Sequence, residues 1–172
     1  NKRIAEIKHN IGMLYSEKGE FNPALKEFDS SISYAVKSGN LSSISISYLS
    51  KAYVYSKLND LPLANAFADK AMDISYRIND RLSIADVYKV KGIIQRNNMN
   101  FELAENYLLT SLRINKDLDN KLNFAETSFE LGLLYKEMKN LNESRKYFSN
   151  AINYYKKIKA FNEVKEIKRN IS

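Results

Sequence analysis

The sequence contains no cysteine and no tryptophan, and it has only five glycines, two prolines and one histidine in 172 residues. Without cysteine there is no disulfide, no thiol nucleophile and no thiolate metal site, and the redox compartment stays undetermined. So few glycines and prolines favour long helices over a strand-rich fold. No apolar run approaches the length that a membrane-spanning helix needs.

Side-chain patterns that carry catalysis or bind metals are also missing. A hydrolase or transferase needs a nucleophile with a base, a pair of carboxylates in a cleft, or a glycine-rich phosphate loop, and none of these is visible. His9 has no cysteine or second histidine to complete a metal site. Asp86 and Glu126 align one repeat apart, which is typical of a solvated face. We therefore predict a protein that is not an enzyme and has no cofactor and no metal site.

The net charge of +7 is unevenly distributed along the chain. Ten of the 27 Lys and Arg residues follow Tyr135, against four of the 20 Asp and Glu residues. A basic end attracts nucleic acid or an anionic membrane surface. A solvated pair of terminal helices explains the same charge distribution more simply, and we favour that interpretation.

A small residue recurs every forty residues, and such a period is typical of stacked helical repeats. Other columns keep the same register, for example Tyr15, Tyr55 and Tyr135. The small residues of this column are Gly12, Ala52, Gly92 and Gly132.

Each repeat is predicted to hold two helices, because its apolar residues follow helical spacing. Turn-forming residues separate the two helices at Gly19-Glu20, Asn59-Asp60 and Asn98-Met99-Asn100. Consecutive repeats are separated by Gly39-Asn40, Asn79-Asp80 and Asp119-Asn120, which tolerate the left-handed backbone of a helix C-terminus. The segment 43–47 alternates polar and apolar residues as a strand does, but its register with the other repeats favours a helix.

The small-residue column is expected to be where the two helices of a repeat approach each other. Opposite it we expect the small residues of the second helices, so that small residues meet small residues while Tyr and Phe fill the grooves beside them. Those second-helix residues are Ala24, Ala64, Ala104 and Ser144.

The repeats resemble the tetratricopeptide repeat (TPR) family. The residues that carry the resemblance are Leu131-Gly132-Leu133-Leu134-Tyr135, then Phe21, Ala24 and Phe28 in the first repeat, and Leu141, Phe148 and Ala151 in the fourth. The resemblance implies an all-α fold, a right-handed superhelical solenoid of antiparallel helix pairs with about nine helices. The usual repeat has 34 residues and a closing proline. Here Val36, Tyr76, Lys116 and Lys156 stand at that proline's position, which lets the second helices run longer.

We expect residues 1–172 to form a single TPR-like domain. Its repeats cover approximately 1–40, 41–80, 81–120 and 121–160, and residues 161–172 either cap the array or begin a fifth repeat. Since the chain starts at Asn1 and ends within the repeating pattern, we expect it to be a fragment of a larger protein.

The resemblance also implies a binding surface, because TPR proteins bind extended peptides or helices on the concave face of their first helices. One column of that face is apolar in every repeat, and cations flank it, which suits an amphipathic or mildly acidic protein segment. The alternative is that these residues pack against neighbouring helices. The predicted groove residues are Met13, Leu49, Tyr53, Lys57, Lys89, Ile93, Arg96, Phe129, Leu133 and Lys136.

The functional prediction is a protein-protein or peptide-binding module, the sensor or scaffold part of a larger bacterial regulatory protein, which also has array ends for self-association. The alternative is binding of nucleic acid or an anionic surface through the basic C-terminal end with Tyr154 and Tyr155, although nucleic acid is the less favoured partner. A chaperone-tail clamp is disfavoured, because His9 and Met13 replace its Lys and Asn. The cytoplasm is favoured as compartment, or the periplasm if the segment belongs to a membrane-anchored regulator.

Overall fold

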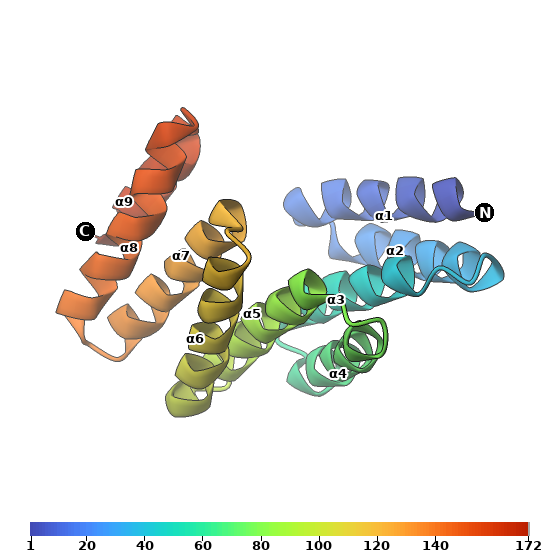
Figure 1. Cartoon of the computed structure of the whole chain (residues 1–172), viewed down its shortest axis with the longest axis horizontal. Coiled ribbons are helices and arrows are strands. Elements are labelled where there is room, and N and C mark those ends of the chain that lie inside the picture. The colour runs from blue at the N-terminus through green and yellow to red at the C-terminus, as the bar shows by residue number, and fades with distance from the viewer. Residues whose placement is uncertain (172) are drawn as a thin grey trace. The chain divides into compact units, whose positions relative to one another are not determined.

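The computed structural model describes residues 1–171, which form nine α-helices and contain no strand. The predicted all-α fold of antiparallel helix pairs is therefore confirmed, and Ser172 of the predicted terminal segment lies outside the described residues. The helices (Figure 1) are α1 (Lys2–Glu17), α2 (Phe21–Lys37), α3 (Leu41–Lys57), α4 (Leu61–Arg77), α5 (Arg81–Asn97), α6 (Phe101–Asp117), α7 (Lys121–Glu137), α8 (Leu141–Lys157) and α9 (Phe161–Ile171).

The helices fall into two compact units, the first covering residues 1–90 and the second beginning at Lys91, so that α5 contributes to both. In the first unit α1 packs on α2, α2 on α3, and α3 on α4. In the second unit α6 packs on α7, α7 on α8, and α8 on α9. In each of these pairs a helix packs against the next helix in the sequence, as expected for stacked repeats.

Every helix from α1 to α8 is followed by one residue with a left-handed backbone. Two are glycines, with φ of 76° at Gly19 and 64° at Gly39, and the others have φ between 51° and 61°. At the first turn the Gly19 N–H donates to the Ser16 carbonyl at 3.0 Å and the Glu20 N–H to the Tyr15 carbonyl at 2.9 Å, the Schellman pattern. The non-glycine positions are Asn59, Asn79, Met99, Asp119, Lys139 and Lys159.

An Asn or Asp directly after several of these turns caps the next helix. The Asn40 side chain accepts a hydrogen bond from the Ser43 N–H at 3.2 Å, and Asn120 accepts one from the Asn123 N–H at 3.1 Å. Such caps satisfy a backbone donor that the first helical turn leaves unpaired. The cap at Asn40 starts α3, so the strand-like segment 43–47 is helical, as its register predicted.

The three glycines of the small-residue column contact large side chains, which the prediction that small residues meet small ones did not include. A Cβ built on Gly12 would lie 2.6 Å from Phe28 Cε1, and one on Gly92 would lie 2.5 Å from Leu108 Cγ. The predicted small partners are also present: the Ala104 carbonyl oxygen would lie 3.3 Å from the Cβ built on Gly92, and the Gly132 carbonyl accepts a hydrogen bond from Ser144 Oγ at 2.8 Å. The glycines therefore leave space for large side chains that lie one helical turn after the predicted small residues.

Buried hydroxyl groups pair between consecutive repeats. Ser31 Oγ of α2 lies 2.9 Å from Ser47 Oγ of α3, and Ser111 Oγ of α6 lies 3.3 Å from Thr127 Oγ1 of α7. All four side chains are fully buried, and Ser31 Oγ also donates to the Ala5 carbonyl at 2.8 Å, so these buried hydroxyls have hydrogen-bond partners. The same positions between α4 and α5 hold Ala71 and Val87, both buried.

Candidate functional site

The first unit has a groove between α1 and α3. A cavity of about 360 Å³ is lined there by Glu6, His9, Asn10, Ser43 and Ile46. Residues three and four apart share a helix face, so Met13 continues the α1 wall and Tyr53 the α3 wall. The two walls meet where Ser50 Oγ lies 3.5 Å from Met13 Sδ. We call this surface the α1–α3 groove.

His9 forms part of the floor of the α1–α3 groove. Its ring lies 5.5 Å from the Phe28 ring, and its Nδ1 lies 3.4 Å from Ser47 Oγ. Burial lowers the pKa of His9 below its ordinary value of 6.5, because a charged imidazolium is poorly solvated there. At neutral pH His9 is therefore an uncharged hydrogen-bonding group. Among the described residues, no cluster of His, Cys, Asp or Glu has the composition of a metal site.

Five predicted groove residues belong to the first unit. Met13 is 38% exposed, Leu49 and Tyr53 are half-buried, and Lys57 is exposed. The Lys57 ammonium lies 5.0 Å from the centre of the Tyr53 ring, a cation–π contact. Lys89, on the part of α5 that belongs to the first unit, lies 3.4 Å from Asp86. The first unit therefore brings together an apolar strip and a cation on α1 and α3.

Two predicted groove residues of the second unit lie in its interior. Ile93 is 3% exposed, and Arg96 is 9% exposed. Arg96 Nη1 lies 2.7 Å from Glu130 Oε2, and its Nε lies 3.5 Å from Glu137 Oε1. Burial raises the pKa of Glu137, and Arg96 opposes that rise. The guanidinium is thus already paired within the fold.

The remaining three predicted groove residues lie on α7. The Phe129 ring is 5.8 Å from the Phe148 ring, and Leu133 packs against the buried cluster of Phe148, Ala151 and Ile167. Lys136 Nζ donates to the Asn170 carbonyl of α9 at 2.6 Å. These residues contribute to the junction of α7, α8 and α9, where Phe129 and Leu133 are half-buried and Lys136 is exposed.

Sequence reasoning did not select Glu6, Asn10, Ser43 and Ile46, which line the cavity. A usable signal was present, since Glu6 and Ile46 occupy one repeat column and lie two helical turns before Met13 and Tyr53. The predicted groove residues Met13 and Tyr53 lie closer to the C-termini of α1 and α3, whereas the residues that line the cavity lie closer to the N-termini of these helices.

Comparison with known proteins decides the family. A sequence model of the tetratricopeptide repeat matches residues 5–35 and 125–158, within the first and the fourth repeat. The chain therefore contains tetratricopeptide repeats. Repeats of this fold generally form non-catalytic modules that bind other proteins.

Two solved structures are similar to this TPR protein. BtubC (BKLC) from P. vanneervenii has a TM-score of 0.69 at 17% identity, and the match covers 98% of this chain and 80% of that one. A Signal Transduction ATPase with Numerous Domains (STAND) from Pyrococcus horikoshii, with a tetratricopeptide repeat sensor, has a TM-score of 0.69 at 18% identity. The match covers 95% of this chain but only 28% of the STAND protein. Both support the all-α solenoid fold.

No curated protein matches the sequence of this TPR protein. None of the helices in the described part of the chain is long and apolar enough to cross a membrane.

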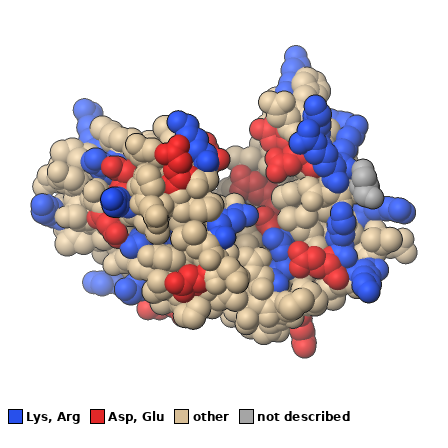
Figure 2. All heavy atoms as spheres, turned by 180° about the vertical axis from the view of Figure 1, so that it is seen from behind, with Lys and Arg blue, Asp and Glu red and all other residues tan. Residues whose placement is uncertain are grey.

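The basic C-terminal end of the TPR protein is a mixed surface. Figure 2 shows its Lys and Arg side chains with Asp and Glu side chains among them. Lys146 lies 2.9 Å from Glu143, and the rings of Tyr154 and Tyr155 meet edge to face at 5.5 Å. Binding of nucleic acid or an anionic surface at this end stays a prediction.

Proposed function

We propose that this TPR protein is an interaction module that holds a peptide or a helix of another protein in the α1–α3 groove. The observation that carries the proposal is the accessible apolar strip in that groove. Ile46 is 40% exposed and Met13 is 38% exposed, and the half-buried Tyr53 lies two helical turns after Ile46 on the same face of α3. Aromatic and methionine side chains at such positions are frequent anchors in protein interfaces.

The charges of the groove define the partner further. Lys57 stands over Tyr53 at one end of the strip, whereas Glu6 and Asn10 line the cavity at the other end. An amphipathic segment fits this arrangement when its apolar side chains cover Met13 and Ile46 and an acidic residue reaches Lys57. His9 is uncharged at neutral pH, so it adds a hydrogen-bonding group without repelling a cation on the partner.

We further propose that the module is the sensor or scaffold part of a larger regulatory protein. The TPR part of the STAND protein is a sensor, and the present chain matches 28% of that protein's length. The reading frame around this segment tests the proposal, since it predicts an attached output domain. A bacterial regulator acting in the cytoplasm is the specific form that we propose.

Selection of binding peptides from a random library tests the groove itself. The best peptide is measured by calorimetry against wild type and against Tyr53→Ala with Lys57→Glu. The proposal predicts a loss of affinity of about tenfold or more, since each 1.4 kcal/mol changes affinity tenfold. Tyr76→Ala with Arg77→Glu is the matched control on exposed positions of α4. Equal losses in both variants would place the partner elsewhere.

A further inference from the structure

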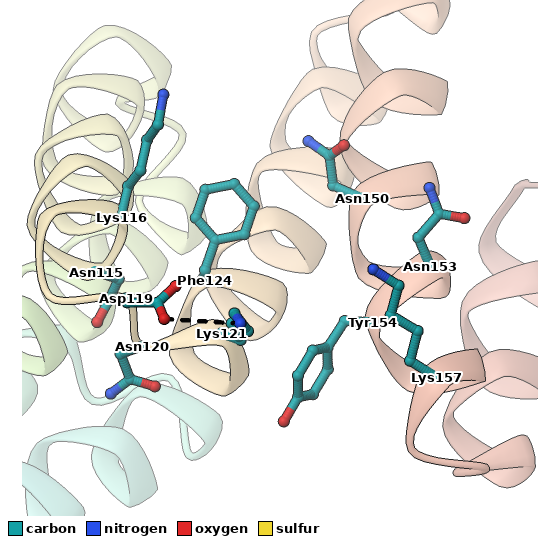
Figure 3. Close-up of a pocket in the computed structure, with 10 residues that line it drawn as sticks. All are labelled: Asn115, Lys116, Asp119, Asn120, Lys121, Phe124, Asn150, Asn153, Tyr154 and Lys157. Carbon is teal, nitrogen blue, oxygen red and sulfur yellow. Dashed lines mark ion pairs between the residues drawn. The ribbon is translucent and has the colours of Figure 1, made fainter.

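The second unit contains a cavity of about 320 Å³ at the junction of α6, α7 and α8. It is formed by the second helices α6 and α8, the connection between repeats and the first turn of α7 (Figure 3), and it shares no lining residue with the predicted groove residues of α7. Figure 3 shows the Phe124 ring on the α7 side and the Tyr154 ring on the α8 side. The lining residues are Asn115, Lys116, Asp119, Asn120, Lys121, Phe124, Asn150, Asn153, Tyr154 and Lys157.

The equivalent junction of the first unit is closed by apolar side chains. Eighty residues earlier, Ala35 stands where the cavity has Asn115, and Leu41 stands where it has Lys121. Ala35 and Ile44 belong there to one buried cluster, against which Leu41 and Ile74 pack. The same fold element is thus a hydrophobic core in one unit and an open cavity with polar side chains in the other.

Asn115 is an unusual residue for the wall of this cavity. It is fully buried, and its Nδ2 donates to Ser111 Oγ at 3.3 Å. Its Oδ1 is buried and accepts no hydrogen bond within the described part of the chain. A buried side-chain amide without a hydrogen-bond partner lowers the stability of the fold, whereas an alanine at the same position, such as Ala35, does not carry this cost.

The charge of the cavity is positive. Asp119 is its one lining carboxylate, and it lies 3.6 Å from Lys121. Within the residues that the structure describes, Lys116 and Lys157 have no ion-pair partner. An anion entering the cavity therefore meets ammonium groups that the fold leaves uncompensated.

We propose that this cavity binds a small organic anion whose carboxylate adjoins an aromatic ring. The ring lies between Phe124 and Tyr154, the carboxylate faces Lys157 and Lys121, and the amides of Asn150 and Asn153 hydrogen-bond the polar atoms beside it. The volume of about 320 Å³ suits a ligand of this size, at the lower end of small-molecule sites. This site is independent of the proposed function, which uses the first-helix face of the other unit.

The probe for this site is N-acetyl-L-phenylalanine, and its amide is the uncharged control compound. Calorimetry and amide chemical-shift mapping are done on the full chain. We expect binding of the acid, shifts centred on Phe124 and Tyr154, and binding of the amide about tenfold weaker, since the charge-assisted contact is lost. Absence of binding of the acid at about 10 mM, ten times a millimolar Kd, overturns the proposal.

Two variants locate the site. Lys157→Gln should weaken the acid about tenfold, whereas Arg77→Gln, at the equivalent position of the closed junction, should leave it unchanged. The triple variant Asn115→Ala, Lys121→Leu, Tyr154→Ile copies the closed junction, and it should lose binding without losing thermal stability. If both Lys157→Gln and the triple variant bind the acid with unchanged affinity, the proposed site is wrong. If the triple variant does not fold, unchanged affinity in Lys157→Gln is sufficient to reject the site.

The same chemistry occurs in a free metabolite and at the C-terminus of a peptide. Comparing N-acetyl-L-phenylalanine with a tetrapeptide that ends in phenylalanine separates these sources. Tighter binding of the tetrapeptide identifies a protein C-terminus, whereas equal or weaker binding identifies a free compound. Either result supports the cavity as the anion site, and neither depends on the α1–α3 groove.

Discussion

The ring of Phe148 occupies the space that a side chain at Gly132 would need. A Cβ built on Gly132 would lie 2.5 Å from Phe148 Cδ1 and 2.6 Å from its Cε1. The second repeat has Ala52 and Ala68 at these two positions, both fully buried. The two positions thus vary together in size: where the first helix has glycine, the second helix has a large side chain, and where the first helix has alanine, the second helix has alanine too.

Gly132→Ala is expected to lower the free energy of unfolding by about 1–3 kcal/mol, although alanine favours a helix by about 1 kcal/mol. The loss arises because Phe148 must move to admit the new methyl group. Urea denaturation measures the change.

The double variant Gly132→Ala with Phe148→Ala copies the Ala52 and Ala68 pair. Phe148→Ala alone should cost about 3–5 kcal/mol through the cavity that it leaves. In the double variant the new methyl group no longer clashes, so its loss should be smaller than the sum of the single losses by about 1 kcal/mol. Strictly additive losses would mean that the two side chains do not compete for one space.

Much of this fold was predictable from sequence, because a repeat supplies several aligned copies of the same signal. The turns at Gly19, Asn59 and Asp119 were identified from residues that tolerate a left-handed backbone. The left-handed residues Lys139 and Lys159 carry no such signal, and only their position in the repeat marks them. The predicted partner of Gly132, Ser144, is present, but the contact of Gly132 with Phe148 one helical turn later was not predicted, since spacing defines a helix face but not every turn of the neighbour that contacts it.

The candidate site was less predictable for a physical reason. Burial at a repeat position depends on the size of neighbouring side chains, so one column holds the accessible Met13 and the buried Ile93. Arg96 has the sequence pattern of a surface cation, but its pairing with Glu130 depends on a contact 34 residues away. No local pattern encodes that contact.

The buried hydroxyl pair of Ser31 and Ser47 should be replaceable only as a pair. Ser31→Ala removes the 2.9 Å contact and leaves the Ser47 hydroxyl without that partner, at an expected cost of about 1–3 kcal/mol. The double variant Ser31→Ala with Ser47→Val copies the apolar pair of Ala71 and Val87. It should be more stable than Ser31→Ala in thermal denaturation, and a less stable double variant would disprove the pairing.

The lowered pKa of His9 predicts a pH dependence of stability. In the unfolded chain the imidazole takes up a proton as the pH falls through 6.5, whereas the buried ring stays neutral until a lower pH. Its contribution to stability is therefore complete above pH 6.5 and is lost as the pH falls from there through the folded pKa. Since carboxylates also titrate, the measured quantity is the difference between wild type and His9→Gln in urea unfolding at several pH values. A difference that does not change with pH would exclude this linkage.

Loss of the charge should lower the stability of the fold at Arg96 but not at Lys57. Arg96→Gln leaves the largely buried Glu130 without its cation and should cost about 3 kcal/mol of stability. Lys57→Gln changes an exposed residue and should stay within about 0.5 kcal/mol of wild type.

The selected peptide completes this comparison. Its affinity should fall in Lys57→Gln and stay the same in Arg96→Gln at temperatures where both variants are folded. A peptide that loses affinity only in Arg96→Gln would move the partner away from the first unit.

The most direct measurement of the proposed function is photo-crosslinking from two equally exposed positions. Ile46 in the α1–α3 groove and Leu63 on α4 are each 40% exposed, so a photoreactive residue fits either place with similar accessibility. The chain carrying the label is irradiated with the selected peptide, and the crosslinked product is quantified by mass spectrometry. The groove predicts strong crosslinking from position 46 and little from position 63. Equal yields from both positions, or a higher yield from position 63, would contradict it.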